Sequence, residues 1–256
     1  MTAEANARQT GEHELDLALA AELQAALLPA SCPAECPHQQ AAALNRMCGH
    51  VGGDFHDFIR INDDQSAIVI GDAVGHGVRA AMLMAKLMGH LRSGPANLTR
   101  PAAMVDELNR MLVGLGERTG SVVSCSLFYA VLDLPSGVGF FANAGHPTPL
   151  LCDRHKCSTL PWGPRNLLLG VELFQPVEFC HTFAPGERMV LYTDGLTDAA
   201  NPAGEMFGAA RLHEVVDRCS RASPAECARA VFDAVAAFRA GARQTDDESI
   251  VVLDRV

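Results

Sequence analysis

Apolar residues near the start of the chain recur with helical spacing. Residues 12–28 (EHELDLALAAELQAALL) are rich in Ala and Leu, and leucines stand at every fourth position. The pattern predicts a helix that ends before Pro29, because proline cannot continue a helix. A helix with so much apolar surface must be covered, either by its own domain or by a second copy of the chain. Residues 1–11 are polar, and we expect a disordered tail there. The ridge of leucines comprises Leu15, Leu19, Leu23 and Leu27.

Beyond Pro29, continuous apolar runs and amphipathic stretches occur in blocks. The runs predict strands and the stretches with 3.6-residue periodicity predict helices. Because the blocks do not follow a strict βαβ alternation, the pattern favours an α+β fold with antiparallel sheets. We expect residues 29–256 to form one domain. Strands are predicted over residues 66–71, 122–134, 139–143, 188–193 and 249–253, and helices over 78–91, 102–112, 209–219 and 224–239.

Composition and charge narrow the choice of partners. The chain has 256 residues, of which 48% are hydrophobic and 20% charged, as in a globular protein. Its formal charge of −10 argues against nucleic acid and anionic membrane surfaces as partners, since both attract clustered Lys and Arg. An apolar run long enough to span a bilayer and a signal-peptide layout are both missing, so a cytoplasmic location is expected. The nine cysteines are scattered, and no disulfide framework is expected.

Aspartates stand at the ends of several apolar segments, beside glycine or a predicted strand. A carboxylate at a strand end is held rigidly, and an adjacent glycine lets a ligand approach closely. Converging carboxylates repel one another unless cations lie between them, and Mg²⁺ and Mn²⁺ prefer oxygen ligands. One Asp-Gly alone is more often a turn, but the set predicts a two-metal hydrolytic site. Its members are Asp54 after two glycines, Asp72 after AIVIG, Asp194 after MVLYT, and Asp246 and Asp247 before SIVVL.

The order of the motifs resembles one protein family. VGGDFHDF, IGDAVGHGVRAAMLMAKL, NAGHPTPLL, LLLG, LYTDGLTDAANPAGEMFG and TDDESIVVL follow one another as in the metal-dependent serine/threonine protein phosphatases (PPM, type 2C-like), in their bacterial SpoIIE-like and RsbU-like branch. The resemblance extends over about residues 20 to 255. It implies a β-sandwich of two antiparallel sheets flanked by helices, with a two-metal centre at one edge.

The resemblance also implies the site residues, motif by motif. The catalytic metal ligands would be the carboxylates of Asp54, Asp72, Asp194 and Asp246, together with the backbone carbonyl of Ala73. Asp247 lies next to a ligand and is expected to support it, whereas Asp57 is not expected to be a ligand. The implied cofactors are two ions of Mn²⁺ or Mg²⁺, with a third ion left open.

The implied reaction is in-line attack of a metal-activated water on phosphoserine or phosphothreonine, without a covalent enzyme intermediate. The implied substrate is a phosphorylated regulatory protein, such as an anti-anti-sigma factor of a partner-switching pathway. Two alternatives stay open: a phosphatase-like binding module without turnover, and a hydrolase of small phosphorylated molecules. In this branch the N-terminal helix commonly takes part in dimerisation, so we consider a homodimer through residues 12–28 beside an ordinary covering helix.

The sequence departs from the branch at a few positions. Met47-Cys48 stand where Pro-Ala is usual, and His56 replaces an aromatic residue near the predicted site. The roles of His56 and His76 are open between proton transfer and structure. His146 is expected to be a buried hydrogen-bonding residue behind the site. All the implied ligands are present, so we expect an active enzyme.

Overall fold

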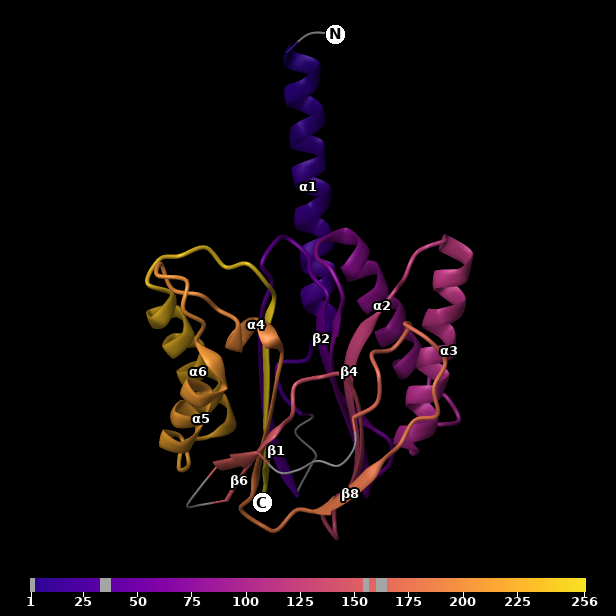
Figure 1. Ribbon diagram of the computed structural model, residues 1–256, viewed down its shortest axis with the longest axis vertical. Coiled ribbons are helices and arrows are strands. Elements are labelled where there is room, and N and C mark those ends of the chain that lie inside the picture. Colours follow the sequence, from indigo (N-terminus) through magenta and orange to yellow (C-terminus); the bar gives the residue numbers. More distant parts are fainter. Residues whose placement is uncertain (1–2, 33–37, 154–156, 160–164) are drawn as a thin grey trace.

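Two five-stranded antiparallel sheets pack face to face in the computed structural model, which describes residues 3–32, 38–153, 157–159 and 165–256 (Figure 1). This is the sandwich of antiparallel sheets expected from the sequence. Sheet A has the strand order β1 (Gln39–Arg46), β10 (Glu248–Arg255), β9 (Arg188–Tyr192), β6 (Leu150–Cys152), β7 (Cys157–Thr159). Sheet B has the order β2 (Asp54–Arg60), β3 (Gln65–Ala73), β4 (Cys125–Asp133), β5 (Val138–Ala144), β8 (Phe179–Thr182).

Helices cover the outer faces of both sheets. α2 (Val78–Arg92) and α3 (Pro101–Thr119) pack on sheet B, while α5 (Gly208–Arg218) and α6 (Pro224–Arg239) pack on sheet A (Figure 1). A single turn, α4 (Asp194–Thr197), follows β9. Because each sheet has a helix layer on one face and the other sheet on the opposite face, the molecule has four layers.

Side chains of the central strands alternate between two cores. In β3, Ala67 and Val69 pack under α2 and α3, whereas Ile68 and Ile70 pack between the two sheets. In β10, Val252 faces the α5–α6 layer. Strands buried on both faces read as unbroken apolar runs, which is why the sequence predicted them.

The N-terminal helix α1 spans Ala3–Leu27 and projects from one end of the sandwich (Figure 1). It begins at Ala3 rather than at Glu12, so residues 3–11 are helical where we expected a disordered tail. Alanine is the strongest helix former and this stretch contains several, while the glycine at position 11 weakens a helix without ending it.

The leucine ridge of α1 faces away from the domain. Leu15 is 61% exposed, Leu19 49% and Leu23 71%. Only near its end does the helix reach the body of the protein, where Gln24 is buried. The domain itself therefore leaves the ridge uncovered.

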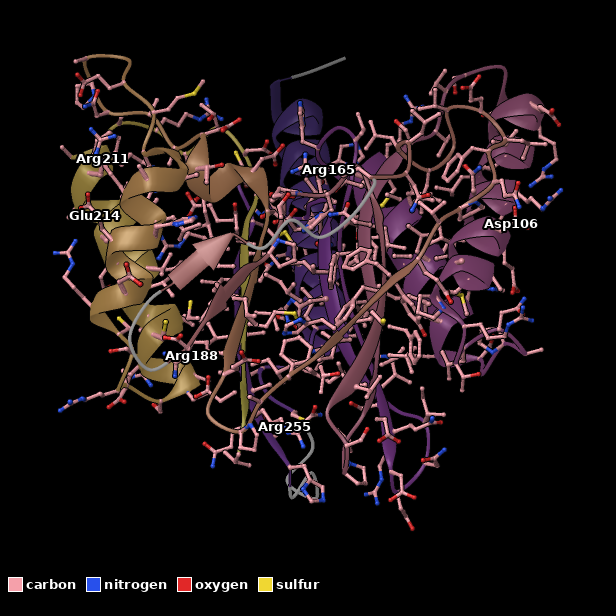
Figure 2. All side chains as sticks on the ribbon, turned by 60° about the horizontal axis from the view of Figure 1, so that its bottom comes forward. Asp106, Arg165, Arg188, Arg211, Glu214 and Arg255 are labelled. Carbon is pink, nitrogen blue, oxygen red and sulfur yellow. The ribbon has the colours of Figure 1, made fainter. Side chains whose placement is uncertain are left out.

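The outer faces of the helices carry charged side chains. Figure 2 shows Asp106 on α3 and, on the opposite side of the molecule, Arg211 and Glu214 on α5. Within the described residues, no helix is both long and apolar enough to cross a membrane.

One cysteine forms a disulfide bond, although no disulfide framework was expected from the scattered cysteines. Cys152 is disulfide-bonded. It lies at the end of β6, opposite Cys157 of β7 in the ladder that pairs these two short strands. The apolar pattern did not predict these two short strands.

Candidate metal centre

The predicted carboxylates lie where strands of both sheets begin or end. Asp54 opens β2, and its partner in the antiparallel ladder is Asp72 of β3. Asp194 begins α4 directly after β9, and Asp246 precedes β10, the neighbour of β9. In an antiparallel pair, one strand ends where its neighbour begins. Asp54 and Asp72 therefore share one end of sheet B, and Asp194 and Asp246 share one end of sheet A.

Hydrogen bonds from sheet A to sheet B bring these two ends together, and they form the edge of the sandwich at which the candidate ligands lie. The hydroxyls of Thr193 and Ser249 both donate to Oδ2 of Asp54, at 2.8 and 2.7 Å. All three side chains are buried, at 1% exposure or less. The segments that carry Asp194 and Asp246 are thereby fixed beside Asp54.

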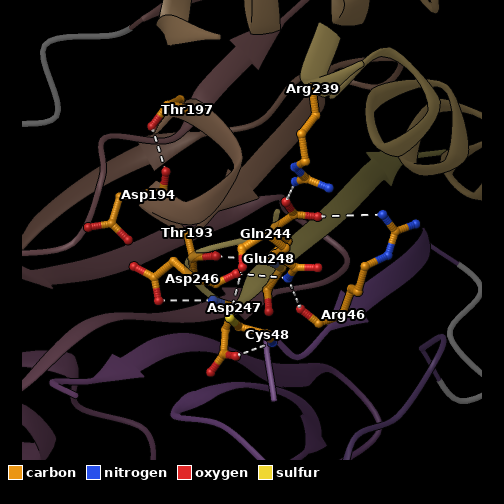
Figure 3. A network of polar contacts seen from close by, with 11 residues as sticks. Arg46, Cys48, Thr193, Asp194, Thr197, Arg239, Gln244, Asp246, Asp247 and Glu248 are labelled. Carbon is orange, nitrogen blue, oxygen red and sulfur yellow. Dashed lines mark hydrogen bonds and ion pairs between the residues drawn. The ribbon is translucent and has the colours of Figure 1, made fainter. Parts of the chain in front are cut away.

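Asp247 is occupied by backbone groups. Its Oδ1 accepts from the N–H of Cys48 and its Oδ2 from the N–H of Gly53, both at 2.7 Å (the Cys48 bond is drawn in Figure 3). The carboxylate is 4% exposed. These two bonds hold the loop that leads into Asp54.

Glycine leaves room for the carbonyl of Ala73. A Cβ on Gly53 would lie 2.4 Å from the Ala73 oxygen and 3.1 Å from Oδ1 of Asp72. Both atoms belong to the implied ligand set. Any larger residue at this position would displace the β2–β3 edge on which that set depends.

The carboxylates raise one another's pKa. Burial raises the pKa of Asp72 to about 7, with further contributions from the negative charges of Asp194, Asp246 and Asp247. Burial is also the main reason that the pKa of Asp54 lies well above its usual value, followed by the charge of Asp72. The pKa values of Asp194 and Asp246 are raised, first by burial and then by neighbouring aspartates.

The described residues provide no Arg or Lys partner for Asp54, Asp72, Asp194 or Asp246. Nor do three or more His, Cys, Asp or Glu side chains in this part of the chain form a ready-made ligand cluster. The carboxylates share an edge without closing into a cage. Such an arrangement fits Mg²⁺ or Mn²⁺, which use few carboxylates and keep several waters.

The three histidines of the site motifs have different surroundings. His56 is buried, and its Nε2 lies 2.9 Å from the carbonyl oxygen of Pro29, at the connection after α1. His76 is exposed in the loop before α2. His146 is buried as expected: its Nδ1 lies 2.8 Å from the Ser126 hydroxyl, and burial lowers its pKa to about 3. His56 therefore supports the fold beside α1, and His146 supports the sheet behind Asp72.

The end of α1 is bound to the loop that precedes Asp54. The side-chain amide of Gln24 donates to the carbonyl of Gly52 (2.7 Å) and accepts from the N–H of the same residue (3.0 Å). Next to this contact, Arg92 bonds both oxygens of Asp57 and donates to the carbonyl of Leu27 (2.8 Å). Asp57 thus forms an ion pair with Arg92, as a residue outside the ligand set would.

A family model described as Stage II sporulation protein E (SpoIIE) matches residues 62–256. The chain belongs to the SpoIIE family. The match includes the segments that carry Asp72, Asp194 and Asp246, and it confirms the resemblance drawn from the order of the motifs. Asp54 and α1 lie ahead of the matched region.

Curated relatives of this SpoIIE-family chain include one protein from Synechocystis and one from Bacillus subtilis. Protein IcfG of Synechocystis sp. is 27% identical over an alignment of 234 residues that covers 80% of this chain and 36% of that protein. Phosphoserine phosphatase RsbU of Bacillus subtilis is 22% identical over 245 residues, 95% of this chain and 71% of RsbU. The chain therefore spans only about a third of IcfG.

Solved structures show the same fold. The SiaA-PP2C domain of Pseudomonas aeruginosa superposes with a TM-score of 0.83 at 22% identity, covering 97% of this chain and 98% of that one. RsbX, solved in complex with magnesium, superposes with a TM-score of 0.64 at 11% identity, covering 86% and 96%. The fold expected for the SpoIIE family is thus confirmed.

Three polar residues of the site were not anticipated from the sequence of this SpoIIE-family chain. Thr193, Ser249 and Gln24 bond to Asp54 or to its loop from distant segments. Thr193 and Ser249 could have been found from the sequence, because each is a hydroxyl residue within three positions of an implied ligand. Gln24 had a weaker signal, as an amide within an apolar helical stretch.

Proposed function

We propose that this chain is a metal-dependent phosphatase that hydrolyses phosphoserine or phosphothreonine on a regulatory protein. The observation that carries the proposal is the group of aspartates at the sandwich edge, from the buried Asp54 to the exposed Asp194 and Asp246, which faces no cationic side chain in the described residues. RsbU of Bacillus subtilis, which is 22% identical to this chain, is named a phosphoserine phosphatase. The proposed substrate is an anti-anti-sigma-like protein.

The proposed ligands are Asp54, Asp72, Asp194 and Asp246, with the carbonyl of Ala73. Two ions of Mg²⁺ or Mn²⁺ held there would supply an activated water and offset the charge of the phosphoryl oxygens. Thr193 and Ser249 orient Asp54, and Asp247 holds the loop before it. Burial, and after it the negative charges of neighbouring aspartates, raises the pKa of Asp72, and a bound divalent cation would offset those charges.

The function is tested by comparing substrates with and without metal. The full chain is incubated with a phosphorylated regulatory protein, with phosphopeptides and with small phosphate esters, each in Mn²⁺ or in chelator. We expect metal-dependent turnover, with the highest kcat/KM on the phosphorylated protein. Higher kcat/KM on small phosphates would identify a metabolite hydrolase. Metal binding without turnover of any substrate would identify a binding module.

We also propose that α1 pairs with a second copy of the chain. Three leucines of its ridge, Leu15, Leu19 and Leu23, are 61%, 49% and 71% exposed on a helix that projects from the sandwich (Figure 1). Leucines with this spacing form one apolar stripe, which two helices can bury against each other.

Light scattering tests the pairing. Replacing the three leucines by Gln should convert a dimer into a monomer. Val171 and Leu173 are similarly exposed, at 52% and 56%, but lie outside α1, so Val171→Gln with Leu173→Gln is the matched control. A monomeric parent chain would refute the pairing and leave the proposed activity untouched.

A further inference from the structure

The Asp54 carboxylate is held by hydroxyl groups rather than by a cation. Thr193 and Ser249 donate to one oxygen, Oδ2, at 2.8 and 2.7 Å. The other oxygen, Oδ1, accepts no hydrogen bond from the described residues. A carboxylate anchored through one oxygen keeps its orientation, and its second oxygen remains available to a ligand.

The direction of these hydrogen bonds is fixed by other groups. Thr193 Oγ1 accepts from the backbone N–H of Ser249 (2.9 Å), and Ser249 Oγ accepts from the side-chain amide of Asn45 (2.6 Å). A hydroxyl has a single proton, so with N–H donors on its lone pairs it turns that proton to Asp54. Asn45 lies opposite Ser249 in the β1–β10 ladder, which places the amide where it is needed.

The two hydroxyls also belong to the other ligand-bearing segments. Thr193 directly precedes Asp194, and Ser249 follows Asp246 by three positions. A further bond ties the segments together, because the Thr193 N–H donates to the carbonyl of Ser249 (3.1 Å). One oxygen of Asp54 is therefore the point at which three candidate ligand segments, from two different sheets, are joined.

We propose that Thr193 and Ser249, oriented by Asn45, are positioning residues that set the mutual geometry of Asp54, Asp194 and Asp246 for divalent-cation binding. This inference rests on the proposed metal centre. A role in folding alone would be filled as well by neutral or apolar residues, since burying a carboxylate without a cationic partner is costly. Hydroxyl donors orient the acid without giving it a cationic partner, which leaves its other oxygen for a cation from solution.

Calorimetric titration of the metal-free full chain with Mn²⁺ tests the proposal without reference to activity. Thr193→Val and Ser249→Ala should each weaken Mn²⁺ binding about 10- to 100-fold, the usual cost of removing a group that orients a metal ligand. Thr193→Ser keeps the hydroxyl and should bind within about threefold of the parent, on the same scale. Asn45→Ala retains both hydroxyls and should weaken binding by a smaller factor, so it serves if a stronger variant fails to fold.

Ser66→Ala is the matched control. Ser66 is a buried hydroxyl of β3 that bonds to the side chain of Gln39, and it has no contact with the carboxylates. It should lower the melting temperature without changing Mn²⁺ affinity. Folded Thr193→Val and Ser249→Ala proteins that bind Mn²⁺ within twofold of the parent would overturn the inference. A parent chain that binds no Mn²⁺ at millimolar concentration would instead overturn the proposed metal centre itself.

Discussion

Two sets of carboxylates lie in the same sandwich and face different partners. Arg188 forms a two-pronged ion pair with Asp254, at 2.6 and 2.7 Å, and Arg239 pairs with Glu248. Asp57 is paired in the same way with Arg92. At the sandwich edge, by contrast, the described residues give the candidate ligands only hydroxyls, backbone N–H groups and one another. The fold can pair an acid with arginine, and at this edge it does not.

The boundary between the two sets falls within two consecutive residues. Figure 3 shows Glu248 turned to Arg239 and Arg46, whereas Asp247 binds the backbone of the loop before Asp54. Glu248 is 1% exposed and Asp247 4%, so burial does not separate them. What separates them is direction: neighbours in an extended chain point to opposite faces, one towards Arg46 of β1 and Arg239 of α6 and the other towards the candidate site.

The comparison predicts that removing a charge at the edge abolishes activity. Asp194→Asn or Asp72→Asn should lower kcat/KM on a phosphopeptide by about 10³-fold, because each would remove a ligand of a charge-stabilising ion. Steady-state kinetics in saturating Mn²⁺ provide the measurement. Asp106→Asn changes an acid on the surface of α3 and should leave kcat/KM unchanged (Figure 2). Full activity of Asp194→Asn or Asp72→Asn would show that the acids without an arginine partner are not needed for catalysis.

Among the arginine-paired acids, the expected loss is in stability rather than in activity. Arg188→Met leaves Asp254 without its partner and removes donors to two backbone carbonyls. The free energy of unfolding should fall by about 3 kcal/mol, as when one member of a buried ion pair is removed. Denaturant melts at constant slope would measure it. If the Arg188→Met protein were as stable as the parent, the pairing would not be what stabilises this set.

Bound metal should stabilise the folded protein through the acids at the sandwich edge, not through the arginine-paired acids. At 100 times its dissociation constant, Mn²⁺ should add about 2.7 kcal/mol to the free energy of unfolding. Thermal melts with Mn²⁺ and with chelator would show the difference as a rise in Tm. The rise should persist in Arg188→Met and disappear in Asp72→Asn, and an equal rise in both variants would contradict the assignment of ligands.

The smallest expected effect is a gain in stability, whereas most mutations lower the free energy of unfolding. Without metal, Asp72→Asn should raise the free energy of unfolding by roughly 1–2 kcal/mol, because it removes a buried charge from among like charges. Urea melts in chelator would measure it. Asp63→Asn is the control: Asp63 is 92% exposed and pairs with Arg60 at the surface, so the change there should be near zero.

The sequence predicted the layers better than it predicted the edge strands. β3 and β10 were visible as apolar runs because both of their faces are buried. β1 and β2 were not predicted. β1 is rich in Ala and Gln, and β2 carries Asp54, His56 and Asp57, all buried. Those side chains are buried because of partners elsewhere in the fold, and local periodicity contains no information about such partners.

The same limit applies to the site. Motif order identified the acids, because each stands at a strand end beside a glycine or an apolar run. It did not identify Thr193 and Ser249 as partners of Asp54, from which they are separated by 139 and 195 residues. Which hydroxyl bonds which acid depends on the packing of one sheet on the other, and that packing is a property of the whole sandwich.

Gly52 has consequences for how this sequence can vary. Gln24 occupies both its N–H and its carbonyl, and a Cβ would lie 1.9 Å from Oδ2 of Asp247. A Cβ on Gly195 would meet the backbone oxygen of the same Asp247 at 1.8 Å. Under selection for activity, a library randomised at both positions should return glycine almost alone, whereas one randomised at Gly75 or Gly77, where a Cβ meets nothing, is limited only by backbone conformation. Asp247 alone therefore prevents neutral substitution of glycine at two positions that are far apart in the sequence.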